Sequence, residues 1–99
     1  MTVNLLPFAP ENTWNMRLHL SREAIALLHA LREESAPLHT MLAEIMRNPD
    51  QKDALRSDER PGRYEIFVKA GTRGFWIGYE VERDRGETVI RAGIVEDHG

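Results

Sequence analysis

Hydrophobic and polar residues alternate in four stretches of this chain, and two stretches between them follow the helical period instead. The alternating stretches are residues 14–20, 63–71, 75–82 and 89–95. A period of two is typical of a β-strand with one buried face. In the helical stretches, apolar residues recur three and four positions apart, at Ala24, Leu27, Leu28 and Leu31 and again at Leu38, Met41, Leu42 and Ile45. The pattern therefore predicts the order strand, helix, helix, strand, strand, strand.

Residues typical of helix ends lie on both sides of each helical stretch. Ser21 stands where an N-cap side chain accepts a hydrogen bond from a free backbone amide. Glu33-Glu34 interrupt the first apolar stripe, and Ser35 begins a second one in which Pro37 suits the first turn of a helix. Asn48-Pro49 end that second stripe. Two helices joined by so short a turn are predicted to pack as an antiparallel helical hairpin.

The segments between the predicted helices and strands have compositions typical of loops and turns. Residues 49–62 are rich in charged side chains and are interpreted as a crossing from the helices to the sheet, with a helical turn around Ala54 and Leu55. The segments "TRG" at 72–74 and "RDRGE" at 83–87 are predicted turns, the second with Gly86 at a positive φ,.

Helices gathered on one face of a mostly antiparallel sheet define an α+β fold. We therefore predict a β-α-α-β-β-β domain whose helical hairpin packs on one face of a mostly antiparallel four-stranded sheet. The helices are expected to cover the face that carries Met16, Leu18, Ile66, Val68, Ile77, Tyr79, Ile90 and Ile94. The opposite face, here called the open face, is expected to collect Arg17, His19, Glu65, Phe67, Lys69, Trp76, Glu80 and Arg91.

Composition narrows the classes of protein that this chain can represent. With 99 residues it is long enough for one small domain, which we assign to residues 13–99, preceded by an N-terminal arm at 1–12 that mixes apolar residues with prolines,. The chain has no cysteine, which excludes disulfides and thiolate metal sites and fits a reducing cytoplasm,. It has no apolar run long enough for a membrane span, and its net charge of −3 argues against a protein that coats nucleic acid,.

The strand arrangement resembles the RelE/ParE superfamily of bacterial toxins from toxin–antitoxin pairs. The resemblance covers residues 14–98 and rests on the element order and on the segment "GRYEIFVKAGTRGFWIGYEV" at 62–81. This segment is similar to the family's pattern of a glycine, an aromatic residue and a short strand, followed by a strand with a "YxV" step, here Tyr79-Glu80-Val81.

The resemblance implies an endonuclease that cleaves messenger RNA on the ribosome with residues of the open face and the C-terminus. Such a reaction removes a proton from a 2′-hydroxyl, stabilises charge on the phosphate and protonates the leaving oxygen. By this resemblance Lys69 and Arg91 would stabilise the phosphate, Glu65 or Glu80 would act as base, and His98 would act as acid. Phe67 and Trp76 would stack on bases, with Arg73 and Arg17 as further contacts to the nucleic acid.

The resemblance also implies partners. A small antitoxin protein would cover the open face with an extended or helical segment, and the ribosome and messenger RNA would be bound during cleavage. No cofactor is expected. The histidines at 19, 29 and 39 recur every ten residues, which fits neither helical nor strand spacing for metal ligands, so no metal site is expected,.

A second hypothesis is a RelE/ParE-like module that binds a protein without catalysis, as an inactive toxin descendant or a gyrase-type inhibitor. Trp76 and Phe67 occupy places where the family often has arginine, which removes charge that would hold RNA. In this interpretation the two aromatic side chains are covered by the arm or by a dimer partner. The charged residues of the open face would then form cross-strand ion pairs on a solvated surface.

Overall fold

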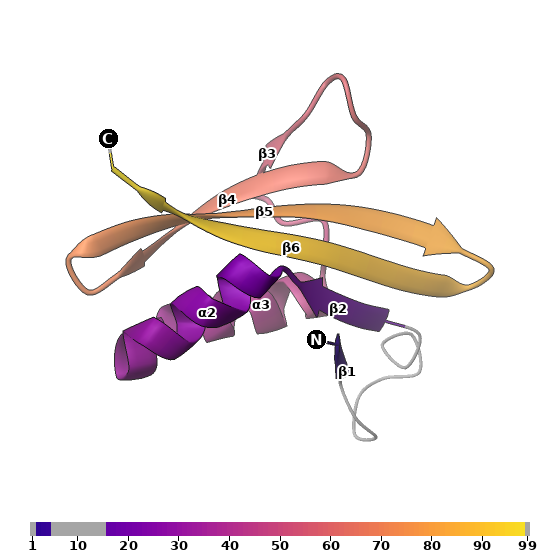
Figure 1. Cartoon of the computed structure of the whole chain (residues 1–99). Helices are drawn as coiled ribbons and strands as arrows, with labels where there is room; N and C mark the ends of the chain where they lie inside the picture. The colour runs from indigo at the N-terminus through magenta and orange to yellow at the C-terminus, as the bar shows by residue number, and fades with distance from the viewer. Residues whose placement is uncertain (1, 5–15, 99) are drawn as a thin grey trace.

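A computed structural model describes residues 2–4 and 16–98 of the chain. One mixed sheet of six strands lies over two α-helices that both occupy the same side of it (Figure 1). The helices are α2 (Arg22–Leu31) and α3 (Ala36–Arg47), joined by the 3₁₀ turn η1 (Arg32–Ser35). The strands are β1 (Thr2–Asn4), β2 (Met16–Leu20), β3 (Leu55–Arg56), β4 (Arg63–Ala70), β5 (Arg73–Asp84) and β6 (Glu87–Asp97).

The strand order across the sheet is β1-β2-β6-β5-β4-β3, with β2 and β6 parallel and every other neighbouring pair antiparallel. The predicted α+β class, with helices on one face of a mostly antiparallel sheet, is confirmed. The predicted number of four strands is wrong, because two short strands extend the sheet at its edges.

Both edge strands are too short for alternation to reveal them. In β1, part of the predicted arm, Thr2 to Asn4 pair with residues 17–19 of β2. In β3, Leu55 and Arg56 pair with Glu65 and Tyr64 of β4, where a helical turn was predicted. Backbone pairing with an existing strand decided the conformation of both segments. The arm residues Leu5, Leu6 and Phe8, and the predicted strand start at Trp14, lie outside the described residues.

The core lies between the sheet and the helices. Every residue predicted on the covered face of the sheet is buried, with at most 7% of its surface exposed. From the helices, Leu28 and Leu31 of α2 and Leu42 and Ile45 of α3 join the same cluster. Because each fully buried aliphatic side chain contributes roughly 1.5–3 kcal/mol, this shared face specifies the register of the central strands.

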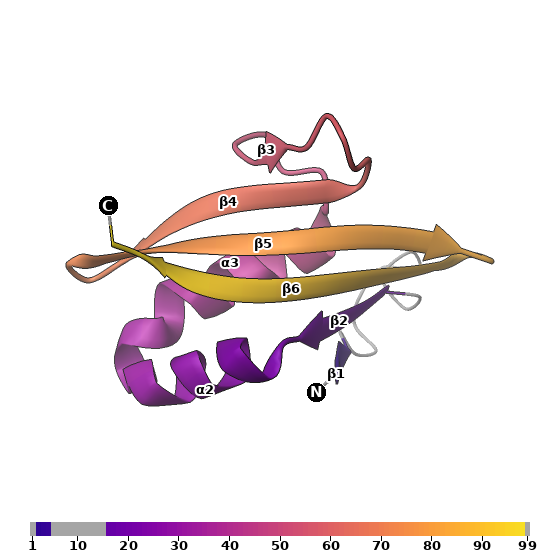
Figure 2. The ribbon, with the colours of Figure 1, turned by 45° about the horizontal axis from the view of Figure 1, so that its top comes forward.

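The helix ends follow the local sequence. The Oγ atom of Ser21 accepts a hydrogen bond from the amide of Ala24 at 3.0 Å, as an N-cap should,. The first helix ends at Leu31, and Arg32 takes a φ of 51°. The helices do not form a closely packed hairpin: α2 packs against β6, α3 packs against β4, and the two diverge below the sheet (Figure 2).

The two hairpins close with tight turns. Ala70 pairs with Arg73, so the first turn consists of Gly71, at φ 64°, and Thr72, one position earlier than predicted. In the second turn Arg85 and Gly86 both have positive φ, at 51° and 81°. Two positive φ angles match the right-handed twist of the strands that the turn joins.

Candidate functional site

The open face is organised in rows that cross the strands, because residues paired by the sheet register project side by side. One row, here called the charged row, contains His19 of β2, Arg91 of β6, Glu80 of β5 and Arg63 of β4. Every one of these side chains is partly or fully exposed. The register therefore brings an imidazole, a carboxylate and two guanidinium groups into one line across four strands.

Ion pairs hold the charged row in place. Glu80 accepts a hydrogen bond from Arg63 at 3.1 Å and lies 3.3 Å from Arg60. Arg91 does not pair with the facing Glu80 and instead donates to Glu82 at 2.7 Å. The arginines are therefore kept near the carboxylates, and the positive charge of this surface is largely balanced.

Beside the charged row lies a trough with no side chains in its floor. Gly78 of β5 faces Gly93 of β6, and Glu65 of β4 continues the same row. Depressions of about 360 Å³ and 430 Å³ both include the two glycines in their lining and open on either side of them. The trough is thus bounded by the charged row on one side and by an apolar row on the other.

That apolar row contains Val95, Trp76 and Phe67. The rings of Phe67 and Trp76 meet edge to face with centroids 5.3 Å apart. Among the described residues, the large hydrophobic side chains that remain exposed are Val95 (67%), Leu55 (60%) and Phe67 (44%). Leu55 pairs with Glu65 and so lies on the same face. An apolar surface gathered in this way is typical of a contact site for another molecule.

The structure brings together some of the predicted catalytic residues and separates others. Arg91 and Glu80 face each other, and Glu65 lies one row away at the end of the trough. Lys69 pairs with Gly74, six residues along β5 from Glu80, which corresponds to roughly 20 Å,. His98 follows Asp97, which also pairs with Gly74. Lys69 and His98 therefore lie at the far end of the sheet and cannot act on the same phosphate as Arg91.

Of the two further predicted RNA contacts, Arg73 is not on the open face. Its guanidinium lies over the ring of Phe75, whose side chain is in the core, and forms two hydrogen bonds with Glu96 at 2.8 and 2.5 Å. Arg73 lowers the pKa of the Glu96 carboxyl through this hydrogen bonding. Arg17 does lie on the open face, 3.5 Å from Glu87, near the tip of the second hairpin. Arg73 therefore lies on the other face of the sheet from Lys69 and Arg91, and these three predicted RNA contacts are not brought together.

His19 was predicted on the open face with no role in binding or catalysis, and no role was predicted for Arg63. Strand pairing places both residues in the charged row. The register of β2 on β6 sets His19 beside Arg91, and the register of β4 on β5 sets Arg63 beside Glu80. A parallel pairing between the first and last long strands cannot be derived from alternation alone.

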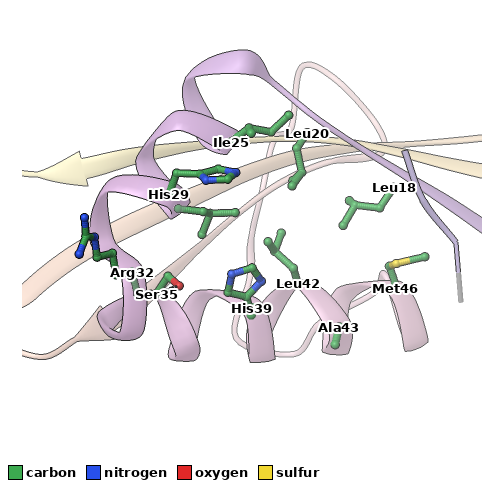
Figure 3. Close-up of a pocket in the computed structure, with 11 residues that line it drawn as sticks. Leu18, Leu20, Ile25, His29, Arg32, Ser35, His39, Leu42, Ala43 and Met46 are labelled. Atoms are coloured by element: carbon green, nitrogen blue, oxygen red, sulfur yellow. Dashed lines mark hydrogen bonds between the residues drawn. The ribbon is translucent and has the colours of Figure 1, made fainter. Parts of the chain in front are cut away.

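A second concave region lies on the helix side of the sheet. It is a groove of about 560 Å³ between α2 and α3, next to β2, and Figure 3 shows the side chains that line it. Its surface is mostly apolar, with contributions from Leu18, Leu28, Leu42 and Met46. Arg32 of η1 lies at one end of it, followed by His29 of α2, and His39 of α3 lies nearer its middle (Figure 3).

The described part of the chain contains neither a cluster of metal-ligating side chains nor a helix that could cross a membrane. Within residues 2–4 and 16–98, histidine, aspartate and glutamate side chains form no group of three that could hold a metal ion. In the same part of the chain, no helix combines the length and apolar character that a membrane crossing requires.

No family model matches this chain, and comparisons with curated proteins and with solved structures gave no significant match.

Proposed function

We propose that this protein is a RelE/ParE-like toxin of a bacterial toxin–antitoxin pair, acting in the cytoplasm, and that its open face binds and cleaves single-stranded messenger RNA. The observation that carries the proposal is the charged row, in which His19 and Glu80 lie on either side of Arg91. Neighbouring strands are about 4.8 Å apart, so His19 and Glu80 are separated by roughly 10 Å at their backbones, with a cation between them.

This spacing suits in-line cleavage of a phosphodiester. A phosphate held by Arg91 would have one acid–base group on each side, His19 and Glu80. Glu80 would take the proton of the 2′-hydroxyl, whose oxygen attacks phosphorus and forms a 2′,3′-cyclic phosphate. The bond from phosphorus to the 5′-oxygen breaks, and protonated His19 would supply the proton of the new 5′-hydroxyl. Messenger RNA on the ribosome would be the substrate, with Trp76 and Phe67 stacking on its bases.

The second candidate is the non-catalytic RelE/ParE-like module that binds a protein. It is favoured by the exposed apolar side chains of Val95, Phe67 and Leu55. It is also favoured by the pairing of Arg91 and Arg63 with carboxylates, which reduces their pull on a polyanion,.

The groove between α2 and α3 supports the proposal of an antitoxin partner. A short helical segment would place its apolar residues against Leu28, Leu42 and Met46,. An acidic residue at the end of that segment would lie near His29 and Arg32. Such a partner would leave the open face available or would reach it with a further extended segment.

The test is growth of a bacterial host after induced expression, together with ribosome-dependent cleavage of messenger RNA by purified protein. We expect wild type to arrest growth, and Arg91→Ala to lose roughly 100-fold or more in cleavage rate because it removes charge stabilisation from the phosphate. Lys69→Ala is the matched control, since Lys69 is an exposed cation of the same face about 20 Å away,. It should keep both properties.

Other results would redirect the proposal. Arrest by wild type and by Arg91→Ala alike would favour the protein-binding module. Normal growth with folded wild-type protein would refute the toxin function.

A further inference from the structure

Two glycines in the trough have no role in folding that the structure explains. A Cβ atom added to Gly78 would find no atom within 4 Å, and one added to Gly93 would meet only the Ser21 Oγ at 3.8 Å. Neither glycine has a positive φ. By contrast, Gly74 on the same strand lies under the Phe67 ring, which would be 2.4 Å from an added Cβ.

Glycine inside a strand is unfavourable for stability, by roughly 0.5–1 kcal/mol relative to alanine. Two of them facing each other in the middle of β5 and β6 incur this cost twice. A strand glycine that neither turn geometry nor packing requires often marks a place where a ligand approaches the backbone closely. No described atom outside the neighbouring residues lies within 4 Å of a Cβ added to Gly78, so there is space directly above its backbone for such a ligand.

The walls of the trough indicate the shape and chemistry of that ligand. Trp76 and Glu80 are four residues apart on β5, roughly 13 Å, so their side chains leave a gap suited to a flat ring lying against the indole,. Glu65 lies in the row of the two glycines and lines the trough with Trp76. No ion pair joins Glu65 to another described residue. Its carboxylate is therefore an available hydrogen-bond acceptor at the end of the trough.

We propose that the trough is a slot for one nucleobase, which stacks on Trp76 and rests on the backbone of Gly78 and Gly93. The Glu65 carboxylate accepts a hydrogen bond from an exocyclic amino group, so the slot prefers cytosine to uracil or thymine. This inference rests on the proposed function, since the neighbouring charged row would hold the adjacent phosphate. It adds a base preference and three residues, Gly78, Gly93 and Glu65, that set it.

The experiment uses DNA hexamers of deoxycytidine and of thymidine, which lack the 2′-hydroxyl and cannot be cleaved. Binding is measured by fluorescence anisotropy at one fixed salt concentration, and thermal unfolding is measured in parallel. We expect Gly78→Ala and Gly93→Ala to weaken binding of the deoxycytidine hexamer at least tenfold, while the unfolding temperature is unchanged or higher. Glu65→Gln should reduce the preference for deoxycytidine over thymidine. Lys69→Ala should leave that preference intact.

The outcomes separate this inference from the proposed function. Cleavage of RNA by wild type, with hexamer binding unaltered by Gly78→Ala, overturns the slot and leaves the nuclease. Absence of cleavage, with hexamer binding lost in Gly78→Ala, supports the slot and rejects the nuclease. Equal binding of both hexamers by wild type overturns the base preference, and no binding of either hexamer overturns the slot.

Discussion

Tyr79 is buried in the core at the point where the connection between α3 and β3 crosses the sheet. Its hydroxyl donates a hydrogen bond to the carbonyl of Pro49 at 2.8 Å, and its ring stacks on Tyr64 with centroids 5.0 Å apart. Burial raises the pKa of the Tyr79 hydroxyl to about 12. This one side chain thus links the hydrophobic face of β5 to the backbone of a charged loop.

Removal of that hydroxyl should destabilise the protein and change its response to alkali. We expect Tyr79→Phe to lower the free energy of unfolding by about 1 kcal/mol near neutral pH, because the Pro49 carbonyl loses its donor. In wild type the folded pKa is above the unfolded one, so the contribution is complete below pH 10 and lost as pH rises through about 12,.

Urea denaturation at a series of pH values checks both effects. Tyr64→Phe is the control, since Tyr64 stacks on the same ring without the bond to Pro49. An equal alkaline loss in wild type and Tyr79→Phe would contradict the assignment.

At the scale of elements, the junction between the helices stores backbone strain. Arg32 has φ 51° and ψ −119°, a combination that glycine adopts readily and residues with a side chain rarely adopt,. This backbone conformation ends α2 at Leu31 and turns the chain, so that α3 runs in a different direction. The groove lies between the two helices. Local sequence predicted where the helices end, but the angle between them depends on this residue.

Relief of the strain should stabilise the fold. We expect Arg32→Gly to raise the free energy of unfolding by about 1 kcal/mol. Strained positions of this kind cost about 1–3 kcal/mol, and part of the gain is offset because glycine loses more conformational entropy on folding than arginine does. Ala30→Gly, at an exposed position inside α2, is the matched control and should lower it by about 1 kcal/mol,. Thermal unfolding measures both, and a loss of stability in Arg32→Gly would show that the side chain is needed.

At the scale of the whole molecule, charge is distributed in a way that restrains RNA binding. The chain has a net charge of −3, and the arginines of the open face are held by carboxylates. Arg91 is bound to Glu82 and must exchange that partner for a phosphate. Affinity for RNA should therefore be modest, and it should increase when a carboxylate that pairs with one of these arginines is neutralised.

Neutralising one carboxylate tests this view. Glu82→Gln should strengthen RNA binding and raise the slope of log affinity against log salt by about 0.7, the value for one additional phosphate contact on a single strand. Glu96→Gln is the control, because it frees Arg73 on the helix side of the sheet and alters the net charge equally. Anisotropy titrations over a range of salt compare the two, and equal gains would mean that net charge alone controls binding.

The local pattern by itself determined the helices, the four long strands and their faces. Met16, Ile77 and Ile94 are buried as predicted because a period of two leaves only one way to hide the apolar side chains,. The cap at Ser21 followed from local hydrogen bonding in the same way.

Tertiary structure alone decided which side chains meet. The parallel register of β2 on β6 aligned His19 with Arg91, and the antiparallel register of β4 on β5 added Arg63 beside Glu80. It also carried Lys69 and His98 to the other end of the sheet and Arg73 to the other face. The physical reason is that alternation specifies a strand's face, whereas its neighbours and its offset along them depend on how all the strands share one core.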